Sequence, residues 1–382
     1  MQDKLRIAII TNIIPIYRKG FYDRLFRRQD IYVKVYCQDR IPGIRLDSLY
    51  YLYPGNVELV KYISLKKERL AFQFLPWHRI IKDYDVIFIS GNPRVLSDLI
   101  FGSLLRLIKK RVVLWTMARS YRGNKITENI RLLWARIFPI IFVYTDKEVD
   151  YLKNKGFNKH FILGMNNGLD QNKIEAAIKL WPEERLNEWK EKKGYKGKLI
   201  LLSVGRLETK NKYALMLRAL TKIIPEKPEV IWCLIGDGEE KGLLEKMAKE
   251  LGINKNIKFI GALFDEEKLA PYFLSAKLFI HPGAIGLSLL HAFGYGLPVI
   301  THNREDLHGP EYAAFVNGIT GQTFSYNDHE SLADVTIRTL NSPKKIDEMK
   351  INVQKIAREK YNVDVMVERF VEIARYAANM KL

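Results

Sequence analysis

The sequence predicts an α/β protein built from two doubly wound, Rossmann-like domains, each a parallel sheet between two layers of helices. Two observations support this fold class. Short, nearly continuous apolar strands alternate with amphipathic helical segments, and this alternation begins at Leu5 and begins again at Leu199. A chain of 382 residues is also long enough for two domains of ordinary size.

The first half contains the strands expected over 5–11, 31–37, 86–90, 111–116 and 139–145, with a helical pattern over 93–110. We assign residues 1–165 to an N-terminal Rossmann-like domain. The polar, lysine-rich stretch that follows, residues 166–198, is expected to be an interdomain linker region.

The second half repeats the pattern, with strands expected over 199–205, 229–236, 257–262, 277–283 and 297–303. Residues 199–360 are assigned to a C-terminal Rossmann-like domain. Residues 361–382 are expected to form a C-terminal helix that packs back toward the N-terminal domain. In doubly wound folds, ligands bind at the carboxyl ends of the strands, so loops at those ends are the first candidates for a site.

The charge of the chain is concentrated in its first half. The formal net charge is +19, and residues 1–200 hold 38 Lys and Arg against 20 Asp and Glu. Nucleic acid or an anionic membrane surface would explain this asymmetry, and a solvated basic surface without a specific partner is the alternative. No zinc-type Cys/His spacing, RNA-binding aromatic signature or repeat accompanies the charge. We therefore expect no nucleic-acid partner.

The composition, 47% hydrophobic and 27% charged, is that of a soluble globular protein. Cys37 and Cys233 lie in apolar strand-like runs, which favours two buried thiols in a reducing compartment. The first residues read as a strand rather than a signal peptide, and no apolar run approaches the roughly 20 residues of a membrane-spanning helix. The expected location is the cytoplasm.

A cationic loop follows the strand expected at 199–205, in the sequence "VGRLETKNK". Gly205 allows a tight exit from the strand, and Arg206, Lys210 and Lys212 place positive charge at its carboxyl end. Such a loop suits a pyrophosphate, which an arginine binds through two parallel hydrogen bonds. A solvated basic loop is the alternative.

A second anion-binding feature is expected in "GAIGLSLLH", residues 283–291. Gly286 permits close approach of a ligand to the backbone, and the N–H groups of Leu287 and Ser288 would point outward from a helix start. Together with the cationic loop, this favours a nucleotide diphosphate ligand. Because cations and a helix terminus hold the phosphates, and no histidine has a metal-ligand spacing, we expect no metal.

The second half also resembles a known family. "VGRLETKNKYALMLRAL", "LIGDGEE", "GLSLLHAFGYGLPVIT" and "HGPEYAAFVNGITGQTF" occur in the order seen in glycosyltransferase family 4, whose members are retaining, nucleotide-sugar-dependent enzymes. The resemblance is strong over about residues 199–340 and weak in the first half. It implies the GT-B fold, in which two Rossmann-like domains face each other across a cleft.

The resemblance implies transfer of a sugar from a UDP- or GDP-linked donor to a glycan or lipid-linked acceptor, with retention of configuration and no further cofactor. The setting it implies is the biosynthesis of a bacterial surface polysaccharide such as a capsule, exopolysaccharide or lipopolysaccharide. The basic domain 1–165 would face the acceptor and the anionic inner surface of the cell membrane, making the protein peripheral there. A catalytically silent nucleotide-sugar-binding protein is the alternative.

The resemblance also assigns roles in the second half. Arg206 and a nearby lysine would bind the donor pyrophosphate; the family lysine falls on Asn211, so Lys210 or Lys212 must replace it. Two family glutamates, one near the transferred sugar and one at the ribose, fall on Gly283 and His291. His291 is expected to take over the ribose contact, since imidazole can donate or accept a hydrogen bond. Glu311 in "HGPEY" is the candidate catalytic carboxylate, with a structural role as the alternative.

The first half departs further from the family pattern. In place of the usual glycine pair after the first strand stands "NIIPIYRKGF", in which Arg18, Lys19 and Gly20 are expected to approach donor phosphates or an acceptor. A basic loop is the alternative. The family histidine after a strand of this domain is missing from "LWTMARS", where Arg119 is the nearest polar candidate.

Overall fold

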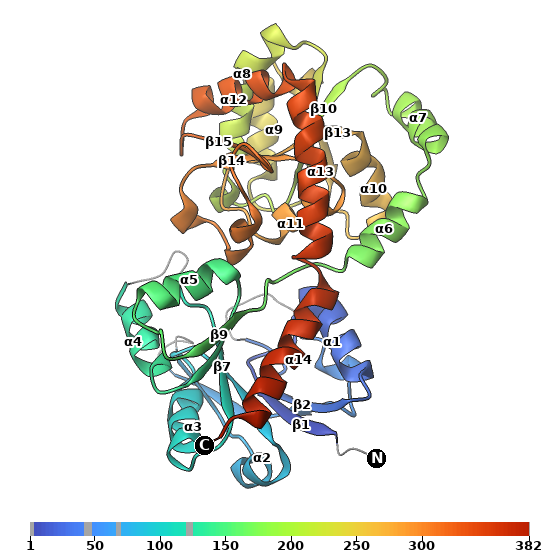
Figure 1. Ribbon diagram of the computed structural model, residues 1–382. Helices are drawn as coiled ribbons and strands as arrows, with labels where there is room; N and C mark the ends of the chain where they lie inside the picture. The colour runs from blue at the N-terminus through green and yellow to red at the C-terminus, as the bar shows by residue number, and fades with distance from the viewer. Residues whose placement is uncertain (1–3, 42–47, 66–69, 120–124, 382) are drawn as a thin grey trace. The chain divides into compact units, whose positions relative to one another are not determined.

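A computed structural model describes residues 4–41, 48–65, 70–119 and 125–381. The chain forms two compact units (Figure 1), the first comprising Met1–Asn167 and Val363–Leu382, the second Gly168–Asn362. Each unit has a parallel sheet covered by helices on both faces. The prediction of two doubly wound, Rossmann-like units is therefore confirmed.

The first unit contains a seven-stranded sheet in the order β3-β2-β1-β6-β7-β8-β9, with every neighbouring pair parallel. An antiparallel hairpin of two further strands stands apart from this sheet. The strands of the sheet are β1 (Leu5–Ile10), β2 (Ile31–Cys37), β3 (Val57–Leu59), β6 (Val86–Ser90), β7 (Val112–Thr116), β8 (Ile140–Val143) and β9 (Phe161–Gly164), and the hairpin is β4 (Tyr62–Leu65) and β5 (Leu70–Gln73).

Alternate residues of these strands enter two separate cores, as expected for a sheet buried on both faces. Ile7 and Ile9 belong to the core shared with α1 and α14, whereas Ala8 and Ile10 belong to the core shared with α3 and α4. The helices of the first unit are α1 (Lys19–Arg27), α2 (Trp77–Asp83), α3 (Leu96–Leu107), α4 (Lys125–Ala135), α5 (Asp146–Asn154) and α14 (Val363–Asn379).

The C-terminal helix α14 is an integral part of the first unit, which is where the sequence analysis placed it. Its Phe370 is fully buried and stacks on Phe88 of β6, with ring centroids 4.3 Å apart. Arg369 donates a 2.6 Å hydrogen bond to Asp146 at the start of α5. Removing this helix would expose the core of the sheet.

The second unit contains a six-stranded sheet in the order β12-β11-β10-β13-β14-β15, again parallel throughout. Its strands are β10 (Leu199–Val204), β11 (Val230–Ile235), β12 (Ile257–Gly261), β13 (Ala276–His281), β14 (Val299–His302) and β15 (Gly321–Phe324). Its helices are α6 (Gln171–Lys179), α7 (Glu183–Lys192), α8 (Tyr213–Glu226), α9 (Lys241–Glu250), α10 (Glu266–Ser275), α11 (Leu287–Gly294), α12 (His329–Leu340) and α13 (Pro343–Glu359).

The stretch 166–198 is not a linker, and this expectation was wrong. From Gly168 onward it belongs to the second unit and folds into α6 and α7. Tyr195 is buried in the core, and the Trp189 ring packs edge-on against the Tyr272 ring of α10, with ring centroids 4.9 Å apart. Most of its lysines lie on the exposed sides of amphipathic helices, which is why its composition resembled that of a linker. Its apolar residues pack into the core of the second unit.

Cys37 and Cys233 are both buried free thiols, as predicted. Among the residues that the structure describes, no helix is both long enough and apolar enough to pass through a membrane.

Candidate functional site

Three loops of the second unit meet at the carboxyl edge of its sheet, after the adjacent strands β10, β13 and β14. The loop after β13 contacts the loop after β10, where the Ala284 N–H lies 3.5 Å from the carbonyl oxygen of Lys210. It also contacts the loop after β14, where the Gly309 N–H donates to the carbonyl oxygen of Ile285 at 2.8 Å. Because parallel strands end at one edge, residues about 100 positions apart form one site.

The loop after β10 presents its cations around one carboxylate. The Arg206 guanidinium lies 3.6 Å from Glu208, and the Lys210 ammonium forms a closer ion pair with the same side chain. Both cations are largely exposed, with 65% and 53% of their side-chain surface accessible. Exposed ion pairs of this kind contribute little to stability, so both cations are available to an anion.

Asn211, which stands where the family lysine would fall, has a structural role in this loop. Its side chain is buried and donates a 2.7 Å hydrogen bond to the carbonyl oxygen of Arg206. Lys212 follows in the left-handed conformation, with φ of 55°. Its ammonium is hydrogen-bonded to Asn327 and lies 3.7 Å from the ring centroid of Tyr326. Lys210 and Lys212 therefore occupy different surroundings.

Gly283 lies where a family glutamate would fall, and the packing there excludes a side chain. A Cβ at this position would lie 2.2 Å from the Lys210 carbonyl oxygen and 2.5 Å from the Asn211 Cα. Contacts below 3.0 Å require the backbone to move. The tight packing of the two loops thus explains why no carboxylate is present at position 283.

A carboxylate nevertheless reaches this region from the third loop. Glu311 is buried, and a Cβ placed on Gly286 would lie 3.5 Å from its Oε2 atom. Gly286 is the N-cap of α11, so the Glu311 carboxylate lies beside the start of the helix that carries Leu287 and Ser288. A negative charge is stabilised at such a helix terminus.

Two stacked histidines hold the third loop in place. The His308 Nδ1 atom accepts a 3.2 Å hydrogen bond from the Ile285 N–H, and its Nε2 atom donates to the His302 carbonyl oxygen at 2.9 Å. These bonds assign His308 the neutral tautomer with the proton on Nε2. Burial and the neighbouring His308, Lys212 and His281 lower the pKa of His302 to about 3.

His291 forms a polar cluster with Glu266 and Tyr295, neither of which was predicted from the sequence to lie at the site. Its Nε2 atom lies 2.7 Å from Glu266 Oε1, at the start of α10, and the Tyr295 hydroxyl donates to the same oxygen at 2.7 Å. Although burial favours its neutral form, the hydrogen bonds from His291 and Tyr295 hold the pKa of Glu266 below its usual value. A carboxylate is thus present beside position 291, contributed by another helix. Glu266 and His291 are 25 residues apart, so no local spacing indicated it.

Phe264 lies in the loop between β12 and α10, two residues before Glu266. Its side chain is 94% exposed, the largest exposure of any large apolar residue described. An aromatic ring in this position offers a flat apolar face at the same edge of the sheet.

The first-unit candidates occupy unlike environments. Arg18 is buried, with its guanidinium over the rings of Trp115 and Tyr144 at 4.9 and 5.1 Å. Lys19 is paired with Asp23 at 2.6 Å, one turn further along α1. Gly20 is buried inside α1. Arg119 is exposed after β7 and lies over the Tyr151 ring at 4.9 Å. Arg18 and Lys19, although adjacent in the sequence, thus lie in different surroundings, the first buried and the second in a partly exposed ion pair.

Glu148, in α5, is a buried carboxyl group at the carboxyl edge of the first-unit sheet, and no pattern in the sequence indicated it. It accepts backbone hydrogen bonds from Ala118 at 3.0 Å, Arg119 at 3.3 Å and Tyr144 at 2.9 Å. Burial raises the pKa of Glu148 to about 7, against the opposing effect of these hydrogen bonds. Its contacts tie the ends of β7 and β8 together.

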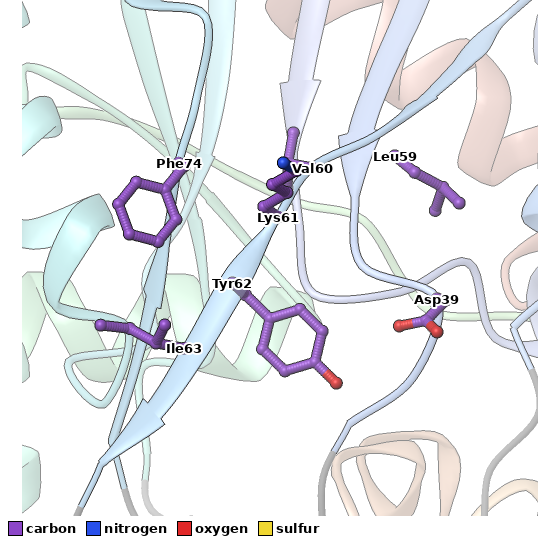
Figure 2. A pocket seen from close by; sticks show the side chains of 7 residues that line it. All are labelled: Asp39, Leu59, Val60, Lys61, Tyr62, Ile63 and Phe74. Carbon is purple, nitrogen blue, oxygen red and sulfur yellow. The ribbon is translucent and has the colours of Figure 1, made fainter.

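An apolar groove of about 580 Å³ lies beside β3 and the β4–β5 hairpin (Figure 2). Its walls are Leu59, Ile63, Phe74 and the Tyr62 ring, with Asp39 and Lys61 as the charged lining residues. Leu59, Ile63 and Phe74 are each about half exposed, at 47%, 47% and 54%. Exposed apolar side chains gathered around a groove mark a binding surface.

Comparison with known proteins agrees with this geometry. Residues 186–356 match the model of the family Glycosyl transferases group 1. This segment is similar to the proteins of that family. It begins within α7 and ends within α13, and so includes Arg206, Gly286, His291 and Glu311.

Two curated proteins are similar over part of the chain. The lipopolysaccharide core biosynthesis glycosyltransferase LpsE of Rhizobium meliloti is 25% identical over 137 residues, covering 35% of this chain and 37% of that protein. The alpha-monoglucosyldiacylglycerol synthase of Streptococcus pneumoniae is 29% identical over 130 residues, covering 33% of this chain and 29% of that protein. The matched segment thus spans about a third of each relative.

The crystal structure of Anabaena HepE (Alr3699) in complex with UDP is similar over nearly the whole chain. The TM-score is 0.70 at 16% identity, covering 98% of this chain and 100% of that chain. Similarity at this level of identity establishes the fold, and the chain therefore has the GT-B fold. In the residues described, no group of three or more His, Cys, Asp or Glu side chains is arranged to hold a metal ion.

Proposed function

We propose that this protein is a glycosyltransferase that moves a sugar from a nucleoside-diphosphate donor to a glycan or lipid-linked acceptor, with retention of configuration. The observation that carries the proposal is the meeting of Arg206, Lys210 and the start of α11 at one edge of the second sheet. Cations and outward backbone N–H groups together suit a diphosphate. As the sugar departs, the same groups stabilise the charge that grows on the diphosphate.

The nucleoside is proposed to bind beside this diphosphate site. His291 and Glu266 offer a donor and a charged acceptor for the ribose hydroxyls, and Tyr295 keeps the carboxylate in place. Phe264 is free to lie against the base through its exposed ring. The donor is UDP- or GDP-linked; HepE was crystallised with UDP, which favours uridine.

Glu311 is proposed as the carboxylate nearest the transferred sugar, in place of the glutamate that Gly283 excludes. Its alternative role is to cap α11. Glu311→Gln keeps the shape of the side chain and removes its charge. A role at the sugar predicts turnover reduced by about 10²-fold with an unchanged melting temperature. A capping role predicts a lower melting temperature with turnover kept in the folded fraction.

The acceptor side is proposed to lie in the first unit, which is also proposed to rest on an anionic membrane. On the outward faces of α3 and α4, and just after the last turn of each helix, large aliphatic side chains are exposed, namely Ile100, Leu104, Leu107 and Ile108, and Ile126, Ile130, Leu133 and Ile137. The helices contact each other through Ser103 and Trp134, hydrogen-bonded at 3.3 Å. We call these eight residues the aliphatic face.

Basic residues flank the aliphatic face at the carboxyl ends of its helices. Lys109 and Arg136 are exposed there, and Arg136 donates a 2.9 Å hydrogen bond to the carbonyl oxygen of Lys155, an exposed residue after α5. Apolar side chains bordered by cations match the two parts of an anionic lipid surface, its acyl chains and its head groups. This complementarity favours a lipid surface over a protein partner.

The proposed setting is the synthesis of a bacterial surface polysaccharide on the inner face of the cell membrane. Two relatives support it by what their names state: one acts in lipopolysaccharide core biosynthesis and one makes a glucosylated diacylglycerol.

The full-length protein should be incubated with UDP- and GDP-linked sugars and with lipid-linked glycan acceptors extracted from a bacterial membrane. We expect release of nucleoside diphosphate that depends on the acceptor. A catalytically silent binding protein would instead be stabilised against unfolding by the donor without releasing nucleotide. That result, across all donors and acceptors, would contradict the transferase assignment and support the alternative.

A further inference from the structure

The apolar groove of the first unit lies at the carboxyl ends of β2 and β3, which is the edge of the sheet where doubly wound folds bind their ligands. Its walls come from the segment after β2, the end of β3 and the β4–β5 hairpin (Figure 2). The lining residues that matter here are Asp39, Leu59, Lys61, Tyr62, Ile63 and Phe74. The groove thus lies where the last strand of the sheet order meets the hairpin.

The groove leaves apolar surface in contact with water. Leu59 and Ile63 are each 47% exposed and Phe74 is 54% exposed, and they come from β3, from β4 and from the residue after β5. An apolar ligand in the groove would remove this surface from water, which is the main favourable term in binding. Asp39 and Lys61 are exposed, and they place polar groups at the groove as well.

The size of the groove favours a small ligand over a protein partner. Its volume of about 580 Å³ lies within the range of roughly 300–1,000 Å³ that is usual for small-molecule sites. A stable protein interface involves about 20–30 residues on each side, whereas seven described residues line this groove. A single apolar chain, which can extend along an open groove, matches both the size and the lining.

The hairpin that forms one wall of the groove is fixed to the helix that carries half of the aliphatic face. The Ala71 N–H of β5 donates to the Arg94 carbonyl oxygen at 2.9 Å, and the Gln73 N–H donates to Ser97 Oγ, in the first turn of α3, at 3.0 Å. β4 pairs with β5 and lines the groove. A lipid chain that leaves a membrane held at the aliphatic face would therefore find an apolar site one hairpin away.

We propose that this groove binds the apolar chain of a lipid-linked acceptor and so holds the acceptor at the carboxyl edge of the first sheet. The proposal rests on the proposed function, because it names the part of the acceptor that the first unit recognises. The Lys61 ammonium and the Asp39 carboxylate offer a donor and an acceptor to the polar part of the same molecule.

The test uses alkyl glucosides on the full-length protein, at concentrations below those at which they form micelles. A neutral head group and a single chain keep the diphosphate site and the bilayer out of the measurement. Calorimetry should show affinity that rises by about fourfold for each methylene from hexyl to octyl glucoside, the gain expected when each added CH₂ is buried. Glucose, which has no chain, is the reference and should not compete.

Leu59→Ser and Phe74→Ser should each weaken the binding of octyl glucoside by about threefold to tenfold, since each removes the burial of a side chain that is half exposed in the free protein. Their melting temperatures show whether they are folded, and Ile63→Ser replaces a variant that is not. Ile351→Ser, at a 69% exposed position of α13, is the matched control and should bind octyl glucoside like wild type.

Leu107→Ser separates the groove from the aliphatic face. This variant should lose binding to anionic vesicles and keep its affinity for octyl glucoside, because Leu107 does not line the groove. Leu59→Ser should keep vesicle binding and lose affinity for the glucoside. Loss of both activities in Leu107→Ser would place the chain on the aliphatic face and overturn the proposal.

Equal affinity of wild type and folded groove variants for octyl glucoside, or an affinity independent of chain length, would also overturn it. Groove variants that change the sedimentation of the protein without changing glucoside binding would make the groove an interface between copies of the chain instead. None of these readouts depends on turnover. A protein that binds the chain in this groove and transfers no sugar would refute the proposed function alone. A transferase whose KM for a lipid-linked acceptor is unaltered in Leu59→Ser would refute the groove alone.

Discussion

Individual residues of the second unit determine where carboxylates can lie in the candidate site. Gly283 packs against the backbone of Lys210, so a glutamate there would force the loops apart. Glu311 and Glu266 then bring carboxylates to the neighbourhood of Gly286 and His291 from other elements. Carboxylates are thus present beside Gly286 and His291, although neither position carries one in the sequence.

Arg206 is the residue on which donor binding should depend most. Arg206→Ala removes a charge-assisted contact worth roughly 1.5–3 kcal/mol, and so should weaken donor binding by about 10- to 150-fold. Lys210→Ala and Lys212→Ala should differ from each other, because only Lys212 is held by Asn327 and Tyr326. Calorimetric titration with the nucleoside diphosphate measures each effect.

The control is Glu208→Gln, which releases both Arg206 and Lys210 from their shared ion pairs. It should leave donor affinity unchanged or tighter, since this carboxylate competes with the phosphates. Donor affinity that is unaltered in Arg206→Ala would show that the phosphates bind elsewhere.

His291 and Glu266 should act as a pair. A ribose contact is made in both the ground state and the transition state, so His291→Ala should mainly raise the donor KM, and His291→Gln should recover part of the loss. Because both side chains share one hydrogen bond, the effects of His291→Ala and Glu266→Gln on donor affinity should be clearly non-additive.

Tyr295→Phe serves as the comparison, because it removes the other hydrogen bond to the same Glu266 oxygen without touching His291. It should have the smaller effect on the donor KM. A His291→Ala variant with a normal KM and a collapsed kcat would instead make the histidine a participant in the chemical step.

At the scale of elements, each unit is held together at its functional edge by buried polar side chains that link one strand end to the next. Glu148 joins the ends of β7 and β8 in the first unit, and His308 joins the loops after β13 and β14 in the second. These contacts fix the loops from which the candidate ligand-binding side chains project.

Glu148 should make stability depend on pH. Because its pKa is raised from 4.5 to about 7 in the folded protein, the native state holds the proton more tightly. Its contribution to the free energy of unfolding is therefore complete below pH 4.5 and is lost as the pH rises through 7. The whole pKa shift of Glu148 corresponds to at most about 3 kcal/mol of the free energy of unfolding.

Urea unfolding of wild type and Glu148→Gln at pH 5 and pH 7.5 tests this. The variant should be less stable than wild type by a larger margin at pH 5, since the glutamine does not titrate and the stabilising contribution of the Glu148 proton is nearly complete at that pH. A margin that is equal at both pH values, or larger at pH 7.5, would contradict the raised pKa.

At the scale of the whole molecule, most of the net charge and the aliphatic face both belong to the first unit. By sequence, Met1–Asn167 with Val363–Leu382 hold 33 Lys and Arg against 17 Asp and Glu, which is +16 of the total +19. The aliphatic face on α3 and α4 lies in the same unit. Because the excess positive charge and the aliphatic face lie in the same unit, we expect that unit to carry the proposed membrane-binding surface.

The aliphatic face should determine binding to anionic vesicles. Leu107 and Leu133 are 77% and 71% exposed, and placing either in lipid would contribute roughly 1.5–3 kcal/mol. Leu107→Ser and Leu133→Ser should each weaken binding of the full-length protein to vesicles containing phosphatidylglycerol by about tenfold or more. High salt should weaken the binding of wild type further, because it screens the flanking cations.

Ile351→Ser is the matched control, since Ile351 is 69% exposed on α13 of the second unit. It should leave vesicle binding unchanged. If all three variants bind like wild type, the aliphatic face is not a membrane-binding surface. The full chain is required, because a fragment ending near residue 165 would lack α14 and leave the core around Phe88 open.

The sequence by itself determined the architecture and the family resemblance. Buried parallel strands are nearly continuous apolar runs, so β2 and β6 were predicted at their observed bounds, and the cationic loop after β10 was visible as a local pattern. The helices α6 and α7 were missed, since a lysine-rich amphipathic helix and a polar linker have similar composition.

Only the tertiary structure decided which side chains come together. The Glu266–His291 pair, the Glu311 carboxylate beside Gly286 and the buried Arg18 over the rings of Trp115 and Tyr144 each join segments that carry no spacing signal. The physical reason is that parallel strands bring distant loops to one edge of a sheet, where contacts depend on strand order and packing rather than on separation along the chain.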